Sequence, residues 1–411
     1  MTKFIKGTAL ALTLTAMTTA GAQTHRLPEG YASFFRETAA PTMTSLPSPP
    51  PFATPPLKAE AASGIYGYLF YFNGSNLQQG LYSIAPSTGA TYLWSDYYTS
   101  NSMPMMSGWL RNGTLNGLNA MSLMGGYLFY GQVEIDMTDG DVINWLQLRN
   151  DNDVSNMYLT NAYRILDDHV YGYGPTADGY SYAFKIADAD NIDTTEILKE
   201  VDMEEVCTAL CYNVQDDMFY GVNYTGKFVK VDTKGNQTEL FDLGITNLST
   251  TLSGIVYSAS EKAYIFNAYL KNNSSAMYSI DPVAKKATKL MNCSSGQEYI
   301  FMVTTEVNAD SDAPAKAVLD SYLFDKAALS GTAAFTIAGK TVGGSSLSGS
   351  LDWRLLVDGN QLSTGTTTAG SKQTVSIPAV TNGMHTFAFA VAKDGNYSEP
   401  TTFTTWVGSD Y

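Results

Sequence analysis

The sequence predicts an all-β protein, and three observations support this. Aromatic and glycine residues are abundant, with 27 Tyr, 18 Phe and 35 Gly among 411 residues. Aromatic side chains pack well on pleated sheets, and glycine permits the tight turns between strands. Apolar and polar residues alternate with a period of two in many short segments, which is typical of half-buried strands. An aromatic segment also recurs along the chain, which indicates a repeated structural unit.

Length and composition predict two or three folded domains and exclude a disordered chain. The chain is 44% hydrophobic and only 15% charged, so it contains enough apolar material for cores. Its formal net charge of −15 would repel a phosphate backbone, and no run of Lys or Arg offsets this charge. We therefore predict no nucleic acid partner, and the simplest role of the acidity is solubility.

The N-terminus predicts export. Lys3 and Lys6 precede an uncharged, mostly apolar segment at residues 9–20, and the AGA motif that ends it fits the small-x-small rule for signal cleavage. A segment of about a dozen residues is too short to cross a bilayer about 30 Å thick. We predict that residues 1–22 are a cleaved signal peptide and that the mature protein is secreted, periplasmic or at the cell surface. No transmembrane segment is predicted.

Residues 23–63 predict an extended spacer. Proline removes a backbone donor and favours polyproline conformations, so a proline-rich segment cannot join the interior of a sheet. The prolines gather at Pro41, Pro47, Pro49, Pro50, Pro51, Pro55 and Pro56. We predict a semi-rigid, solvated spacer, with a ligand for proline-recognition domains as the alternative.

The next part of the chain is repetitive. The segment GYLFY at residues 67–71 recurs almost intact at residues 126–130, and weaker copies begin at residues 169, 217 and 262. Each copy is followed by an alternating segment that ends in a turn, and then by a short third strand. Units of this length, made of short antiparallel strands, predict the blades of a β-propeller.

The alternating segment at residues 81–91 (LYSIAPSTGAT) resembles the repeats of secreted bacterial β-propellers, and the resemblance covers residues 64–307. It implies an architecture and no particular activity. Five aromatic copies predict five blades, with six as the alternative because residues 95–125 are long enough to contain extra strands. The apolar segment at residues 299–303 follows the last unit. We predict that it completes the first blade and closes the ring, which removes exposed strand edges.

Residues 312–409 predict an immunoglobulin-like β-sandwich. The Asp-Gly pair at 358–359 and the Asn-Gly pair at 382–383 are strong hairpin signals between short alternating strands. The closing segment at residues 387–400 resembles fibronectin type III modules in part, with Phe387 at a position where that pattern often has Tyr. The combined architecture resembles secreted surface proteins of Bacteroidetes-type bacteria.

The cysteines and acidic clusters predict no metal-binding residue. On one strand, Cys207 and Cys211 would lie about 13 Å apart, which is too far for a disulfide. We predict buried free thiols, with a disulfide between Cys211 and Cys293 as the alternative. No nearby histidine completes a zinc site. The segment DADNID at residues 188–193 lacks the Gly and Glu that a calcium loop requires, so we predict a solvated turn.

No catalytic or cofactor-binding residue is predicted. We interpret Asp167, Asp168 and His169 as a turn between blade strands, because Asp favours turns. Paired carboxylates could serve glycoside chemistry at the propeller funnel. The carboxylates considered for such a pair are Asp96, Glu134, Asp136 and Asp216. Their spacing selects no pair.

Several aromatic residues could form a sugar-stacking surface or a core. The residues considered are Trp94, Trp109, Trp145, Tyr97 and Tyr98. We favour the core, because each blade must bury one face.

These patterns predict an exported, non-enzymatic binding or adhesion protein. The propeller would present a face to a glycan or an extracellular protein, and the sandwich would act as a spacer or docking module. One alternative is a carbohydrate-active enzyme that uses paired carboxylates in the propeller funnel. Another is a purely structural or adhesive module within a longer chain.

Overall fold

The protein is all-β, as predicted, and the computed structural model contains one short 3-10 turn, η2 (Met203–Glu205), among the strands of the described residues. The predicted signal peptide and spacer lie outside the described residues. Within the described ranges, no helix has the length and apolar character needed to cross a membrane. The structure describes residues 64–69, 80–95, 105–111, 113–122, 128–137, 142–147, 156–177, 181–249, 253–272, 274–293, 297–305 and 312–409.

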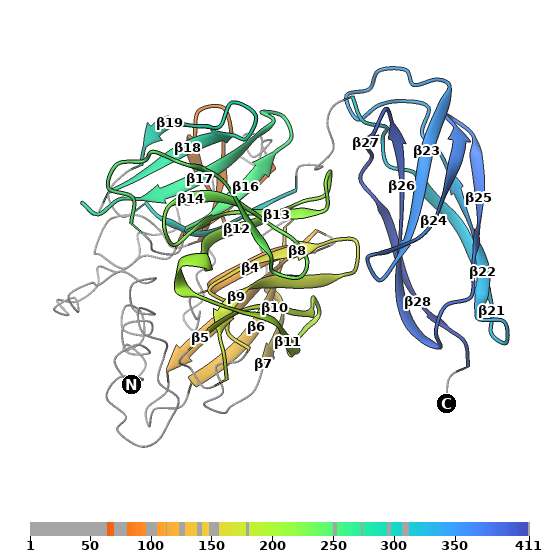
Figure 1. Ribbon diagram of the computed structural model, residues 1–411, viewed down its shortest axis with the longest axis horizontal. Coiled ribbons are helices and arrows are strands. Elements are labelled where there is room, and N and C mark those ends of the chain that lie inside the picture. Colours follow the sequence, from red (N-terminus) through yellow and green to blue (C-terminus); the bar gives the residue numbers. More distant parts are fainter. Residues whose placement is uncertain are drawn as a thin grey trace. The chain divides into compact units, whose positions relative to one another are not determined.

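Strands β1 to β20 form five four-stranded antiparallel sheets, which are the blades of a β-propeller (Figure 1). The blades are β1 (Ile65–Leu69), β2 (Gly80–Ile84), β3 (Thr91–Ser95) and β20 (Tyr299–Thr304); β4 (Met105–Arg111), β5 (Thr114–Ser122), β6 (Leu128–Asp136) and β7 (Val142–Gln147); β8 (Thr160–Arg164), β9 (His169–Pro175), β10 (Tyr182–Asp188) and β11 (Asn191–Val201); β12 (Cys207–Asn213), β13 (Met218–Asn223), β14 (Lys227–Val231) and β15 (Gln237–Asp242); β16 (Ile255–Ser258), β17 (Ala263–Tyr269), β18 (Ser275–Asp281) and β19 (Lys286–Asn292). We number them blades 1 to 5 in this order. The described residues thus form five blades and not six.

The last strand of the propeller completes the first blade, as predicted. Strand β20 pairs antiparallel with β1, with Tyr66 opposite Val303 and Tyr68 opposite Phe301. The rings of Tyr68 and Phe301 stack with their centroids 5.3 Å apart. Strand β20 also lies beside β4 and β16, the first strands of the two neighbouring blades. The pairing of chain segments about 240 residues apart in sequence therefore closes the ring.

Hydrogen bonds join the closing strand to blade 5. The backbone N–H of Tyr299 donates to Asn267 Oδ1 at 2.9 Å. Gln297 Nε2 donates to the hydroxyl of Tyr299 at 2.8 Å and also to Thr91 Oγ1. The hydroxyl of Ser275 donates to the carbonyl oxygen of Gln297. These bonds satisfy buried polar groups where the chain enters β20, and so fix the position of this strand.

Burial falls from the first strand of a blade to its last. In blade 4, β12 is buried at every residue, whereas β15 contains no fully buried residue. In blade 5, the final strand β19 is likewise partly exposed along its length. The first strands of the blades line the centre of the ring and are covered by neighbouring blades, whereas the last strands face solvent.

The two most similar aromatic segments are not equivalent in the structure. Residues 67–69 belong to β1, the second strand of blade 1, whereas residues 128–130 belong to β6, the third strand of blade 2. The second strand of blade 2 is β5, which contains no aromatic residue. The predicted register was therefore wrong for blade 2, because pairing and not local similarity decides the role of a strand. Strands β4 and β5 occupy the region that sequence analysis left unassigned.

Aromatic rings fill the contacts between consecutive blades. The ring of Tyr264 in blade 5 lies 4.9 Å from that of Tyr220 and 5.1 Å from that of Phe228, both in blade 4. The rings of Tyr171 in blade 3 and Phe219 in blade 4 are 5.0 Å apart. Such pairs contribute about 0.5–1.5 kcal/mol beyond the area they bury. The high Tyr and Phe content is therefore explained in large part by packing between blades.

The remaining strands form a two-sheet β-sandwich. One sheet has the order β21-β22-β25, and the other has the order β24-β23-β26-β27, with β28 also paired to β26. The strands are β21 (Val318–Asp325), β22 (Ser330–Thr336), β23 (Ser350–Val357), β24 (Asn360–Thr368), β25 (Lys372–Ile377), β26 (Gly383–Lys393), β27 (Asn396–Tyr397) and β28 (Thr401–Val407). Buried side chains from both sheets form one hydrophobic core. In this core, the rings of Phe335 and Phe389 stack with their centroids 4.0 Å apart.

One of the two predicted hairpin turns of the sandwich is correct. Asp358 and Gly359 have φ values of 47° and 72° and connect the paired strands β23 and β24. Residues 382–383 instead connect β25 to β26, which belong to different sheets. The Asn-Gly pair there marks a crossover and not a hairpin, because the preceding strand pairs with β22.

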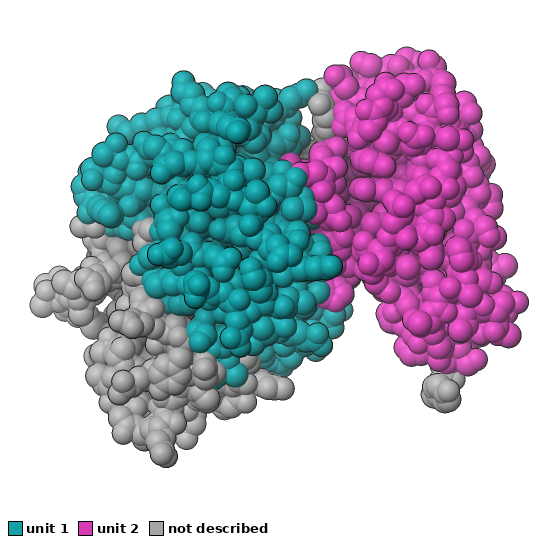
Figure 2. All heavy atoms as spheres, in the orientation of Figure 1, with its two compact units in different colours: residues 1–163, 170–212, 218–306 teal, residues 164–169, 213–217, 307–411 magenta. Residues whose placement is uncertain are grey.

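Contacts divide the chain into two compact units (Figure 2). The first comprises residues 1–163, 170–212 and 218–306, and the second comprises residues 164–169, 213–217 and 307–411. The sandwich belongs to the second unit.

Candidate functional site

The carboxylates considered for a catalytic pair come from two blades. Glu134 and Asp136 lie on β6 of blade 2, two residues apart and so on the same side of the strand. Asp216 lies exposed in the turn between β12 and β13 of blade 4, and Asp96 lies outside the described residues. Blades 2 and 4 are not neighbours in the ring. Among the described candidates, Glu134 and Asp136 are therefore the adjacent pair.

The motif at residues 167–169 forms the predicted turn between β8 and β9. Asp168 has a φ of 62°, in the left-handed region that Asp tolerates. Asp167 accepts a hydrogen bond from Arg164 Nη1 at 2.6 Å. Arg164 also donates from Nε and Nη2 to the two carboxylate oxygens of Asp217, each at 2.7 Å. These charge-assisted bonds hold the turns of blades 3 and 4 together.

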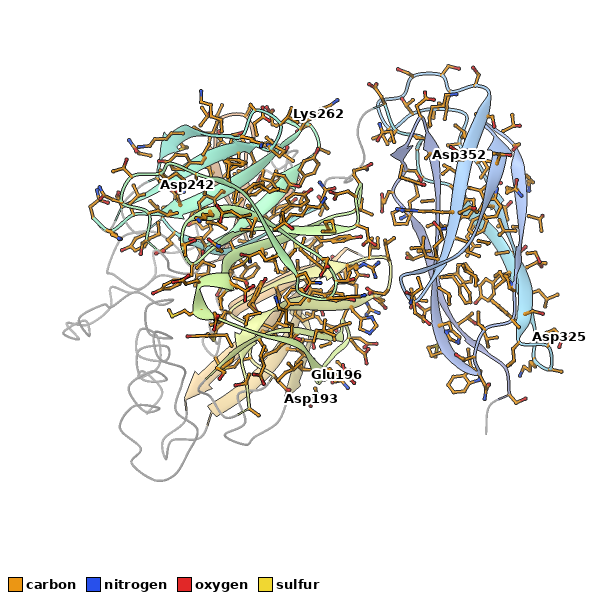
Figure 3. All side chains as sticks on the ribbon, viewed as in Figure 1. Asp193, Glu196, Asp242, Lys262, Asp325 and Asp352 are labelled. Carbon is orange, nitrogen blue, oxygen red and sulfur yellow. The ribbon has the colours of Figure 1, made fainter. Side chains whose placement is uncertain are left out.

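The acidic segment at residues 188–193 spans the turn between β10 and β11. Asp193 Oδ1 accepts a hydrogen bond from Asn156 at 2.9 Å, and its N–H donates to Asn191 Oδ1 at 3.1 Å. Asp193 and Glu196 lie on β11, the last strand of blade 3 (Figure 3). In the described part of the chain, no group of three or more His, Cys, Asp or Glu is placed to hold a metal ion.

Trp109 belongs to the core, as predicted, because its side chain is only 1% exposed. It therefore offers no stacking surface to a sugar in this structure. The side chains of Trp94 and Trp145 lie outside the described residues, as do Tyr97 and Tyr98.

The three cysteines are free thiols, as predicted, and Cys207 and Cys211 are buried on β12. Burial raises the pKa of the Cys207 and Cys211 thiols above the ordinary value. Both therefore stay protonated at neutral pH, whereas the thiolate is the form that attacks substrates and binds metals. These two thiols act as small core side chains.

A group of buried polar side chains lies between blades 2 and 3. Ser107 and Trp109 are on β4, Asn116 is on β5, Gln132 is on β6 and Asn161 is on β8. We call these five residues the interblade polar cluster. Each is less than one-tenth exposed. Buried polar groups in a folded protein are normally hydrogen-bonded, so the partners of these side chains have to be accounted for.

Strand register places the blade 2 members of the cluster on one face. Trp109 lies opposite Asn116, and Asn116 lies opposite Glu134. Residues two apart on a strand share a face, so Ser107 lies beside Trp109, and Gln132 lies beside Glu134. This face is turned towards blade 3, because Ser107 contacts Asn161 of that blade.

Hydrogen bonds link the members of the cluster in two groups. Asn161 Nδ2 donates to Ser107 Oγ at 3.3 Å, which joins the first strands of blades 2 and 3. Gln132 Nε2 donates to Asn116 Oδ1 at 3.0 Å. It also lies 3.5 Å from the carbonyl oxygen of Ala189 in blade 3. Each amide therefore uses its nitrogen in bonds within the protein.

Three buried atoms of the cluster have no hydrogen-bond partner among the described residues. They are Trp109 Nε1, Gln132 Oε1 and Asn161 Oδ1. Leaving one such group buried and unpaired costs about 1–3 kcal/mol. The first atom is a donor and the other two are acceptors. All three atoms are covered by the packing of blades 2 and 3.

Sequence analysis missed four members of this cluster and identified only Trp109, as a core residue. The available signal was the presence of Asn and Gln inside strands, where amides are uncommon. Each has an apolar residue directly beside it, since Leu115 precedes Asn116, Val133 follows Gln132 and Ala162 follows Asn161. The sequence could not show that they meet, because their contact depends on the packing of two blades.

The chain matches no protein-family model and no curated protein. Among solved structures, it is similar to the extracellular domain of a putative hybrid two-component system from B. thetaiotaomicron, at 10% identity and a TM-score of 0.25. That alignment covers 80% of this chain and 48% of the other, so this chain spans about half the length of that structure.

Two further solved structures are covered almost completely. A putative 6-phosphogluconolactonase from Bacteroides fragilis is 11% identical, with 78% of this chain and 99% of that chain covered and a TM-score of 0.33. The SapL1 lectin in complex with alpha methyl fucoside is also 11% identical, with 74% and 97% covered and a TM-score of 0.31. Likenesses this distant assign neither a ligand nor a reaction to this chain.

Proposed function

We propose that the protein is an exported, non-enzymatic binding protein whose propeller holds a ligand and whose sandwich acts as a spacer or docking module. The observation that supports this most directly is the interblade polar cluster, with three buried hydrogen-bonding atoms unpaired in the described residues. These atoms belong to amide and indole groups, which recognise ligands by hydrogen bonding and do not exchange protons near neutral pH. Such groups favour recognition over general acid–base catalysis.

Export and domain division are part of the same proposal. Residues 1–22 would be removed as a signal peptide, and residues 23–63 would form a spacer before a propeller at residues 64–307. The region at residues 312–409 would be a fibronectin type III-like module. Its split into two antiparallel sheets of short strands supports this. The mature protein would then be a surface or secreted protein of the Bacteroidetes type.

The alternative is a carbohydrate-active enzyme that uses Glu134 and Asp136. Two residues on one side of a strand are about 7 Å apart, which is within the range of the carboxylates in inverting glycosidases. Glu134 also lies on the same face of blade 2 as Asn116. This pair is therefore the one to test for hydrolysis.

The test presents the full chain to arrays of glycans and extracellular proteins, and in parallel measures the release of reducing ends from each glycan. We expect retention without release. Release by the wild type that disappears in Glu134→Gln would establish the enzymatic alternative. Absence of retention on both arrays would contradict the binding function.

A further inference from the structure

We propose that Asn382 is a site of spontaneous covalent modification, at which the side-chain amide is lost and the residue becomes isoaspartate or aspartate. Asn382 and Gly383 lie where the chain crosses from β25 to β26, between the two sheets of the sandwich. The inference concerns the sandwich alone, so it does not depend on the binding function proposed for the propeller.

The reaction requires an asparagine directly followed by an accessible backbone nitrogen. The nitrogen of Gly383 attacks Cγ of Asn382, and the new C–N bond closes a five-membered succinimide. The amide nitrogen of Asn382 leaves as ammonia, taking the proton of the attacking N–H. Water then opens one of the two C–N bonds of the ring. Opening the bond to Cγ gives aspartate, whereas opening the bond to the backbone carbonyl carbon gives isoaspartate, in which the chain runs through the side chain.

The backbone at Gly383 leaves room for this attack. A Cβ atom added to Gly383 would meet no described atom within 4 Å apart from those of its chain neighbours. The φ of Gly383 is 154°, a conformation that residues with a Cβ rarely adopt. The crossover therefore requires glycine, which is also the residue that hinders attack on a preceding asparagine least.

The side chain of Asn382 is accessible and is not held by hydrogen bonds. The residue is exposed, and among the described residues its amide has no hydrogen-bond partner. Its Oδ1 packs against the backbone of Gly408. Rotation of the amide towards the nitrogen of Gly383 therefore breaks no hydrogen bond of the described residues.

Asn116 and Gly117 form a second Asn-Gly pair, which serves as an internal control. Asn116 is only 3% exposed, and its Oδ1 accepts a hydrogen bond from Gln132 Nε2 at 3.0 Å. Both residues lie within β5, which is paired with β4 and β6. Attack there must be preceded by local unfolding of the strand, so we expect Asn116 to react more slowly than Asn382 by a factor of at least about 10.

Isoaspartate would disturb the start of β26. Gly383 lies opposite Val407 on β28, so the strand ladder fixes the chain on one side of Asn382. On the other side, the carbonyl oxygen of Thr381 lies 2.9 Å from His385 Nε2. An extra backbone carbon between these two fixed points must strain the crossover or break one of the contacts. Conversion also adds a negative charge, because a carboxyl group is ionised at neutral pH.

The experiment incubates the full chain in mildly alkaline buffer for several days and follows the peptides that contain residues 382 and 116 by mass spectrometry. We expect the peptide with Asn382 to gain one mass unit and to separate into two products, while the peptide with Asn116 stays unchanged. Asn382→Gln keeps an amide but would have to close a larger ring, so this variant should stay unmodified. In urea, where the chain is unfolded, both asparagines should react.

A second measurement tests the effect on the sandwich. The isoaspartate form is purified by chromatography and compared with Asn382→Asp, which carries the same charge without the extra backbone carbon. We expect the isoaspartate form to melt about 4–8 °C lower than this variant.

Each part of the inference has a result that contradicts it. If Asn382 stays intact in the folded chain while it converts in urea, the site is not reactive and the inference is overturned. Equal conversion of Asn116 and Asn382 in the folded chain would overturn the structural explanation, because sequence alone would then decide. Equal melting of the isoaspartate form and Asn382→Asp would overturn the strain at β26.

Discussion

At the residue scale, close backbone approach explains the glycines in the second strands of blades 3 and 4. A Cβ atom at Gly221 would collide with the carbonyl oxygen of Ala209 on the adjacent strand β12, and one at Gly172 would collide with that of Thr160 on β8. The obstacle in both cases is backbone, which cannot rotate away as a side chain can. Glycine is therefore required at these positions by space and not by φ.

We predict that Gly221→Ala destabilises the propeller by about 1–3 kcal/mol, which is the usual cost of overpacking a core. Chemical denaturation followed by near-ultraviolet circular dichroism measures this. Gly339→Ala in the sandwich is the control, because its nearest neighbour would be 3.6 Å away, an ordinary contact. If Gly221→Ala were as stable as the wild type, strands β12 and β13 would have to move apart at little cost to admit the added methyl group.

Asp325 gives the sandwich a pH-dependent turn between β21 and β22 (Figure 3). Backbone N–H bonds from Ala328 and Ala327, at 3.0 and 2.8 Å, lower the pKa of this carboxyl below its ordinary value of 3.8. A lowered pKa in the folded state means that the stabilisation is complete above the ordinary value and is lost as the pH falls through the lowered value.

We therefore predict that the wild type is more stable than Asp325→Asn above pH 3.8 and that the difference disappears at lower pH. Denaturation midpoints of both proteins across this acid range measure it. A difference that stays constant with pH would mean that the charge of Asp325 contributes nothing to the turn.

At the scale of the element, turns between strands carry part of the contact between blades. Arg164, at the end of β8, bonds to Asp167 in its own turn and to Asp217 in the turn of blade 4. The side chains of Arg164 and Asp167 are 5% and 6% exposed, so this is a buried ion pair. Removing one partner leaves a buried charge behind.

We predict that Arg164→Leu destabilises the protein by about 3–5 kcal/mol, since the buried Asp167 carboxylate loses its guanidinium partner. The control is Lys227→Met, which removes a more exposed, solvent-screened ion pair with Glu239 and should leave the stability almost unchanged. The urea midpoint of each variant, compared with that of the wild type, measures these two losses of stability. Similar losses in both would indicate that the Arg164 pair is screened like a surface pair.

Elements were predicted well where turn chemistry is local. The alternating segments that end in Pro, Asp or Gly became β2, β10, β14 and β18, the third strands of four blades. The second strand of blade 2 was missed because β5 lacks the aromatic residues of its counterparts. Its role depends on pairing with β4 and β6, which no local pattern records.

At the scale of the whole molecule, the proposed export determines where the mature chain begins and what charge it carries. We predict that cleavage after residue 22 yields a chain that begins at Gln23 and has a formal charge of −15 − 2 = −17, because Lys3 and Lys6 are removed. Mass spectrometry of the protein recovered from the extracytoplasmic fraction of a bacterial host measures this. An unprocessed chain retained in the cytoplasm would contradict the proposed export.

The ring could be predicted from sequence, but the candidate site could not. Repetition implied blades, and the unpaired segment at residues 299–303 implied closure, because an open ring would leave exposed edges. Asn161 and Gln132 are polar residues in otherwise ordinary strands of different blades. Only the packing of these blades brings them to one interface, and only the complete set of hydrogen bonds shows which atoms are unpaired.

The central claim is that β20 closes the propeller by pairing with β1. Gly64 accepts a backbone bond from Thr305, so the next pair, Ile65 and Thr304, is a non-hydrogen-bonded pair with Cα atoms about 4.5 Å apart. That separation suits a disulfide. The measurement is peptide mapping of the oxidised double variant Ile65→Cys, Thr304→Cys, with Ile65→Cys, Thr238→Cys as the control, since Thr238 lies on β15, the last strand of blade 4. We predict a disulfide between positions 65 and 304 and none in the control, and free thiols at both positions of the double variant would contradict closure.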